Sequence, residues 1–94
     1  MKNANEPRIE FSSKFNKERN AASLDIKIAF REAYEIFQED PDNEVLRNHP
    51  LDKEGKKFFG FWSIDVTGNW RAIYRKEENK IIFVALDTHG RLYK

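Results

Sequence analysis

The six residues IIFVAL, Ile81 to Leu86, are the feature that most restricts how this chain can fold. A continuous apolar run of this length is typical of a β-strand that is buried on both faces. Such a strand needs a partner strand on each side and a cover over each face. We therefore expect Ile81–Leu86 to be the central strand of a sheet.

Two further strands are predicted just before this run, because apolar and polar residues alternate there. They cover Phe58–Val66 and Trp70–Lys76, with a tight turn between them and a second polar turn before Ile81. Short turns of this kind join antiparallel neighbours, so the three strands should form a meander. One face of the first strand is predicted to carry Phe59, Phe61, Ser63 and Asp65.

The first half of the chain predicts one short strand and two helices. Residues Arg8–Phe11 alternate as a strand, and Ser12 or Ser13 can cap a short helix that follows. Residues 23–39 have apolar side chains at helical spacing. The predicted class is α+β, as one domain over residues 1–94 in the order β-α-α-β-β-β. Both helices should cover one face of the sheet, which leaves the opposite face exposed and available for a site.

Composition excludes several classes of site and suggests where charge is concentrated. The chain has no cysteine and no apolar stretch long enough to span a membrane, and it lacks the apolar region of a signal peptide, which suits a cytoplasmic protein. Residues 1–44 hold seven basic and ten acidic side chains, whereas residues 45–94 hold ten basic and six acidic ones. The basic second half permits contact with phosphate.

Neither a phosphate-binding glycine-rich loop nor a paired-histidine metal motif occurs in the sequence. We therefore expect no metal and no cofactor. The remaining candidates for chemistry lie near the ends of the predicted strands. If the meander pairs as expected, the following residues meet at one edge of the sheet: Asp65, Asn69, Trp70, Arg71 and His89. His49 precedes the meander, and Arg91 and Tyr93 follow it.

Such a set could support cleavage of RNA without a metal ion. That reaction needs a base for the 2′-OH proton, an acid for the leaving 5′-oxygen and a cation for the charge on phosphorus. Histidine can serve as either acid or base, and an arginine such as Arg71 or Arg91 can hold phosphate in a bidentate fork. Trp70 or Tyr93 can stack on a base. Each residue also has a structural interpretation, since Trp70 could belong to the core and Asp65 could bond to turn amides.

Residues 45–93 contain three ordered motifs: NHPL, then FFGFWSIDVTGNWRAIYR, then IIFVALDTHGRLY. Together they resemble the RelE/ParE superfamily of bacterial toxins, and most closely its YafQ-like and HigB-like branch. The resemblance implies the toxin of a type II toxin–antitoxin system. Such a toxin enters the ribosomal A site and cleaves mRNA without a metal, leaving a 2′,3′-cyclic phosphate, and a neighbouring gene encodes the antitoxin that blocks it.

The resemblance also implies roles for individual residues. His49 matches the first histidine of the family, His89 the probable general acid, and Tyr93 the aromatic residue that orients the substrate. Arg71 matches a phosphate-binding arginine, and Asp65 stands where the YafQ pattern has a second histidine. The family has an acidic residue before a tryptophan; here these positions are Asn69 and Trp70. Asp87 stands where a glycine is common in the family. The residues expected to dock on RNA or the ribosome are Lys53, Lys56, Lys57, Asn69, Trp70, Arg71, Arg75 and Arg91.

Two other functions fit the same scaffold. One is a ParE-like toxin that inhibits DNA gyrase, although both histidines and the terminal tyrosine argue against it. The other is a binding module without catalytic activity, which the replacements at Asp65 and Asn69 keep open. Growth and mRNA cleavage on expression with and without the neighbouring gene would separate these functions.

Overall fold

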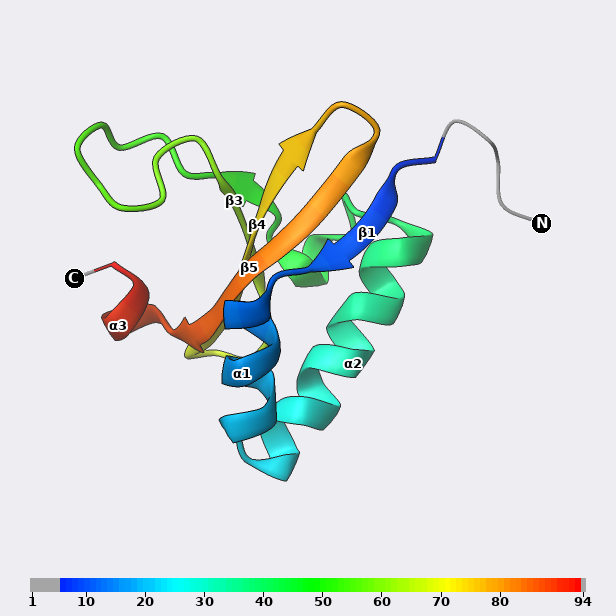
Figure 1. Ribbon diagram of the computed structural model, residues 1–94. Helices are drawn as coiled ribbons and strands as arrows, with labels where there is room; N and C mark the ends of the chain where they lie inside the picture. The colour runs from blue at the N-terminus through cyan, green and yellow to red at the C-terminus, as the bar shows by residue number, and fades with distance from the viewer. Residues whose placement is uncertain (1–5, 94) are drawn as a thin grey trace.

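Within residues 6–93, the part of the chain that the computed structural model describes, the protein forms a five-stranded sheet (Figure 1). The strands lie in the order β1-β5-β4-β3-β2 and have these bounds: β1 Arg8–Phe11, β2 His49–Pro50, β3 Trp62–Asp65, β4 Trp70–Glu77 and β5 Lys80–Thr88. The helices are α1 Ser13–Ala21, α2 Leu24–Glu39, the 3₁₀-helix η1 Glu44–Leu46, and the short α3 His89–Leu92. The predicted α+β class is confirmed, and β2, η1 and α3 are added to the predicted elements.

The run Ile81–Leu86 is a strand with neighbours on both sides, as predicted, but it is second in the sheet, and β4 is the central strand. Strand β5 pairs in parallel with β1 and antiparallel with β4, so its backbone has partners on both sides. The strand continues to Thr88, two residues past the predicted end, and Val84 lies at a shift in register opposite Ile73 and Tyr74. Because β1 and β5 run in the same direction, the chain between them must cross over the sheet, and α1 and α2 form that crossover.

Helices α1 and α2 begin at serine caps and lie against one face of the sheet (Figure 1). Ser12 Oγ accepts a hydrogen bond from the Phe15 backbone N–H at 3.0 Å, and Ser23 Oγ accepts one from the Ile26 N–H at 3.4 Å. These hydroxyls satisfy amides that the first turn of a helix leaves without a partner. Both predicted helices are confirmed to within a residue or two.

The main core lies between these helices and the sheet, and Phe83 of β5 is at its centre. The Phe83 side chain is fully buried. Its ring centroid lies 5.3–6.1 Å from those of six other aromatic residues: Phe11, Phe15, Phe30, Tyr34, Phe37 and Tyr74. Such stacked, tilted and edge-on pairs add to the stabilisation that burial of the rings provides. The high aromatic content of this short chain therefore forms one connected cluster.

The strand predicted over Phe58–Val66 is shorter than expected, because β3 begins only at Trp62. Gly60 has a φ of +88°, a left-handed conformation that interrupts extended backbone. The Phe59 N–H donates to the Lys56 carbonyl and the Phe61 N–H to the Phe58 carbonyl, which are turn contacts. The prediction that Phe59 shares a strand face with Ser63 was therefore wrong, and Phe59 is 49% exposed while Phe58 is buried.

The face of the sheet opposite α1 and α2, which we call the far face, is not bare as predicted. Ile73 and Ala85 are fully buried there, under Phe58 and Leu92. Figure 1 shows the loop of residues 51–61 and helix α3 on this side of the sheet, away from α2. The apolar residues of β4 and β5 on this face need a cover, and the loop and α3 provide one.

Candidate active site

The registers of four strands place His49 beside Ser63 on the far face. Antiparallel partners point to the same side of a sheet, and His49 pairs with Ser63, which pairs with Ile73, which in turn pairs with Ala85. The next row on this face joins Asp65, Arg71 and Asp87. His49 was predicted to lie in a loop. It belongs instead to the two-residue strand β2, which places it on the sheet.

A pocket of about 450 Å³ opens beside this row. The residues that line it come from β2, the loop after it and α3: His49, Pro50, Leu51, Asp52, Lys53, Lys56, Lys57, Phe58, Phe59, His89, Leu92 and Tyr93. Both histidines and Tyr93 therefore meet at one cavity. Three lysines against one aspartate make its wall basic, and an anionic ligand would be favoured there.

Helix α3 and its cap fix the position of His89. The His89 backbone N–H donates to the Asn69 carbonyl at 2.7 Å, which ties α3 to the turn between β3 and β4. Thr88 caps the helix, and its hydroxyl accepts from the Arg91 N–H at 3.3 Å. The imidazole of His89 is exposed and meets the ring of Tyr93 edge-on, with 4.6 Å between centroids. The expected contact between residues 69 and 89 at this edge is confirmed.

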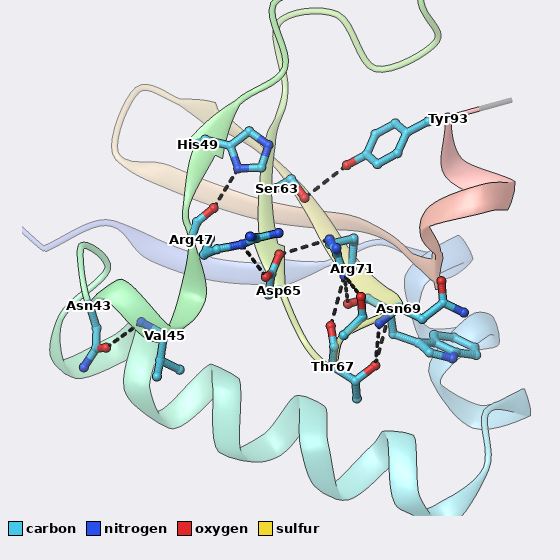
Figure 2. Close-up of polar contacts among 12 residues, drawn as sticks. Asn43, Val45, Arg47, His49, Ser63, Asp65, Thr67, Asn69, Arg71 and Tyr93 are labelled. Atoms are coloured by element: carbon cyan, nitrogen blue, oxygen red, sulfur yellow. Dashed lines mark hydrogen bonds and ion pairs between the residues drawn. The ribbon is translucent and has the colours of Figure 1, made fainter.

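The side chain of Tyr93 lies over the far face and is hydrogen-bonded to β3. Its hydroxyl donates a hydrogen bond to Ser63 Oγ at 3.1 Å, and Figure 2 shows this bond reaching across to β3. Ser63 is fully buried and was not among the predicted site residues. Its place in an alternating strand gave no signal beyond the expectation that it faces the same side as Asp65.

His49 has a hydrogen bond on one ring nitrogen. Its Nδ1 lies 2.6 Å from the backbone carbonyl oxygen of Arg47 (Figure 2). A carbonyl oxygen can only accept, so Nδ1 carries the hydrogen, and in the neutral ring Nε2 is then unprotonated. The imidazole itself is exposed and lines the pocket. His49 thus presents a nitrogen that can take up a proton.

Asp65 lies between two arginines. Its Oδ2 pairs with Arg47 Nε at 2.8 Å, and its Oδ1 lies 3.0 Å from Arg71 Nε (Figure 2). Oδ1 is buried and has no well-aligned hydrogen bond, so the second contact is an ion pair by distance only. Arg47 was not predicted as a site residue, since its role depends on a fold-dependent contact 18 positions along the chain.

Neither Arg71 nor Trp70 lines the pocket, and both side chains pack against other parts of the protein. The Arg71 side chain is only 9% exposed, and its Nη1 lies within hydrogen-bond distance of the carbonyl oxygens of Thr67, Gly68 and Trp70. Trp70 lies on the other face of β4 and packs against the main core. The structure therefore supports the core interpretation of Trp70 that the sequence left open.

The other predicted RNA contacts lie away from the pocket lining. Arg75 pairs with Glu77 at 2.8 Å, and Arg91 lies 3.5 Å from Asp87 in an exposed i,i+4 pair. Asn69 is exposed in the turn, and its N–H donates to Thr67 Oγ1 at 3.2 Å. Only Lys53, Lys56 and Lys57 of the predicted docking residues line the cavity.

Among residues 6–93, no three His, Cys, Asp or Glu side chains are grouped so that they could hold a metal ion. In the same part of the chain, no helix is both long and apolar enough to cross a membrane.

Comparison with known proteins gives structural matches alone, since no protein-family model and no curated sequence matches the chain. YafQ from E. coli strain BL21(DE3) superposes with a TM-score of 0.76 at 20% identity, over 95% of this chain and all of that one. YafQ in the E. coli DinJ–YafQ complex gives 0.66 at 24% identity, again over 95% and 100%. The YoeB/ParE toxin from Agrobacterium tumefaciens gives 0.67 at 13% identity, over 87% and 98%.

These identities are low, but the superpositions cover almost the whole of each chain. The relatives differ in sequence and keep the same arrangement of helices and sheet. The likeness to these proteins is therefore one of fold. The chain therefore has the RelE-like α+β fold, shared with the YafQ and YoeB/ParE toxins.

Proposed function

We propose that this chain is the toxin of a type II toxin–antitoxin pair and cleaves mRNA on the ribosome without a metal ion. The observation that carries the proposal is the pocket on a YafQ-like fold that His49, His89 and Tyr93 line together. Cleavage of RNA by its own 2′-OH needs a group that takes up a proton and a group that gives one. Two imidazoles beside an aromatic ring and a basic wall can supply both groups.

The two histidines divide the proton transfers between them. His49 Nε2 is unprotonated when Nδ1 donates to the Arg47 carbonyl, so it can take the 2′-OH proton. The 2′-oxygen then attacks the neighbouring phosphorus, and the bond from phosphorus to the 5′-oxygen breaks. His89 in its protonated form gives a proton to that leaving oxygen. The products are a 2′,3′-cyclic phosphate and a free 5′-hydroxyl.

Tyr93 and the lysines of the pocket support this reaction. The ring of Tyr93 lies edge-on to His89, so it orients the imidazole and offers a face on which a base can stack. Lys53, Lys56 and Lys57 supply positive charge where the phosphate gains negative charge in the transition state. In this scheme Arg71 has a structural role, because it pairs with Asp65 and donates to the Thr67 carbonyl of the turn.

A cognate antitoxin and the ribosome are the partners that follow from this function, and both place the protein in the bacterial cytoplasm. The YafQ relative has been crystallised in a complex with DinJ. By analogy, a protein encoded beside this chain should bind it and cover the pocket. The basic pocket wall is the surface that we assign to RNA.

The test is expression of the chain in a bacterium, with and without the neighbouring gene. We expect growth arrest and cuts in translated transcripts that map to codon positions, both relieved by the neighbour. The His89→Ala variant should give neither effect while the protein still accumulates in folded form. DNA breaks that depend on gyrase would instead identify a ParE-like poison, and unimpaired growth with intact transcripts would leave only a binding module.

A further inference from the structure

Arg47 connects two residues of the site that do not touch each other. Its side chain binds Asp65 through Nε at 2.8 Å, and its backbone carbonyl accepts the Nδ1 hydrogen of His49 at 2.6 Å (Figure 2). Arg47 therefore joins Asp65 on the far face to the imidazole of His49, which lines the pocket. This connection bears on the state of His49, whose role as base rests on the proposed function.

The backbone of Arg47 adopts a conformation that needs support. Its φ of 44° and ψ of 46° are left-handed, where a residue with a Cβ atom is strained. Arg47 ends η1, and its N–H donates to the Glu44 carbonyl at 3.2 Å. The orientation of the Arg47 carbonyl depends on this conformation, so whatever holds the Arg47 side chain also holds the acceptor of His49.

Asp65 is well placed to hold that side chain. The Arg47 side chain is 68% exposed, whereas that of Asp65 is 17% exposed and is backed by the nearly buried Arg71. The carboxylate of Asp65, which is mostly buried, thus binds Nε of the exposed Arg47 side chain. This arrangement also gives Asp65 a task other than taking a proton, because both of its oxygens face arginine nitrogens.

We propose that Arg47 is a positioning residue for His49, and that Asp65 acts on His49 through it. The Asp65–Arg47 pair holds the carbonyl that keeps the hydrogen of His49 on Nδ1, and so leaves Nε2 free to accept the 2′-OH proton. Without the pair, the carbonyl turns away, and the hydrogen moves to Nε2 in a large share of molecules. In those molecules the ring cannot act as a base at the pocket.

The first test is spectroscopic and needs no activity. The chain has two histidines, so long-range ¹H–¹⁵N spectra of the imidazole nitrogens contain two sets of signals, and His49→Ala assigns them. At a pH where the ring is neutral, we expect wild-type His49 to show a protonated Nδ1 and an unprotonated Nε2. In Arg47→Ala the pattern should shift toward a protonated Nε2, while His89 stays unchanged.

Arg8→Ala is the matched control. Arg8 forms a similar exposed pair with Glu10 on β1, at 3.3 Å and with 75% of its side chain exposed, and it does not line the pocket. Its removal should leave both histidines unchanged. Arg47→Lys can keep a single contact with Asp65 and should restore part of the wild-type pattern. An unchanged His49 in Arg47→Ala overturns the proposal, whether or not the protein cleaves RNA.

The second test measures cleavage at saturating toxin. Arg47→Ala should lower the maximal rate about 10-fold, less than the 10²-fold or greater loss expected when the base itself is removed. The toxin concentration that gives half of the maximal rate should stay the same. A raised half-maximal concentration with an unchanged maximal rate would show instead that Arg47 binds RNA directly. A wild-type protein without cleavage activity would refute the proposed function, and the spectra would still decide the role of Arg47.

Asp65→Asn separates this role from direct proton transfer by Asp65. The amide keeps the size of the side chain but removes its charge, so the Arg47 contact weakens. We expect the same shift of the His49 signals and the same 10-fold fall in maximal rate as for Arg47→Ala. If Asp65→Asn abolishes cleavage with His49 unchanged, Asp65 is the base and the proposal fails.

Discussion

The hydroxyl of Tyr93 donates a hydrogen bond over 3.1 Å to Ser63 Oγ, which lies fully buried in β3. Tyr93 comes after the last turn of α3, and this bond ties its ring to the sheet next to His89. The ring is therefore held by this bond, by its T-shaped contact with His89 and by packing against the apolar cluster of the far face. The hydrogen bond can be removed by mutation without removing the ring.

Removing the hydroxyl of Tyr93 should have a small effect, and removing its ring a large one. A hydrogen bond between neutral groups contributes about 0.5–1.5 kcal/mol, so Tyr93→Phe should slow mRNA cleavage by about 2- to 10-fold. Ser63→Ala should give a similar loss, and the double variant little more, since both remove one bond. Tyr93→Ala should slow cleavage further. Equal rates for Tyr93→Phe and Tyr93→Ala would show that the ring itself does not act.

His89→Ala and His49→Ala should each lower the cleavage rate by about 10²-fold or more, the usual contribution of a general acid or base. Both side chains are exposed, so the free energy of unfolding should change by no more than about 0.5 kcal/mol. Single-turnover cleavage and urea denaturation provide the two measurements. Full activity of a folded His89→Ala protein would remove His89 from the mechanism.

Replacing Lys53, Lys56 and Lys57 by alanine should weaken binding of single-stranded RNA and reduce its dependence on salt. Each contact with a phosphate contributes about 0.7 to the slope of log affinity against log salt, so loss of three should lower the slope by about 2. The control variant loses the same amount of charge elsewhere. In it, alanine replaces Lys17, Lys27 and Arg31, which are exposed on α1 and α2. The same slope change in both proteins would mean that binding is not localised at the pocket.

Phe83→Ala should destabilise the protein more than a typical core substitution. The ring is fully buried and contacts aromatic residues from both helices and two other strands. Truncation of a buried phenylalanine usually costs about 3–5 kcal/mol in the free energy of unfolding. Phe59→Ala, at a half-exposed ring, should cost far less. Similar urea midpoints for the two variants would contradict the position of Phe83 at the centre of the core.

Tyr74 should make stability depend on pH in the alkaline range. Burial raises the pKa of its hydroxyl from 10.0 to about 12, against the opposing effect of its hydrogen bond to Asn48. A group with a raised folded-state pKa contributes fully below pH 10, and that contribution is lost as pH rises through 12. The urea midpoint should therefore fall more steeply from pH 10 to 12 in the wild type than in Tyr74→Phe.

Below pH 9 the two proteins should differ by a constant amount, the value of the contact with Asn48. The other ionisable groups are common to both, so the difference in slope isolates Tyr74. Parallel curves up to pH 12 would show that the Tyr74 hydroxyl ionises as easily in the folded protein as in the unfolded one.

Sequence patterns predicted the elements whose periodicity is set by burial. Residues 24–39 became α2 because their apolar side chains repeat every turn, and Ile81–Leu86 became an interior strand because every residue is apolar. Residues Phe58–Phe61 were wrongly predicted as strand, because four successive residues with three phenylalanines match a strand as well as a packed loop. The positive φ of Gly60 decides between them, and composition does not reveal it.

Part of the arrangement at the candidate site could also be predicted. The strand registers that bring Asp65 to Arg71 and Asn69 to His89 follow from short turns, so they could be anticipated. The pocket wall could not, because the loop of residues 51–61 has no regular pattern. Arg47 acts through its backbone carbonyl, a group that every residue has, so no side-chain motif marks it.

The parallel pairing of β1 with β5 also determines when the sheet can be completed. Arg8 lies opposite Lys80, so β1 has no partner until translation has passed Lys80–Thr88. Contacts so distant in sequence form slowly, after the local helices. A nascent chain that ends before this point carries α1 and α2 but lacks the strand that joins them to β4, as well as His89 and Tyr93. The pocket therefore cannot form until residues 80–93 have been made, well after the residues of α1 and α2.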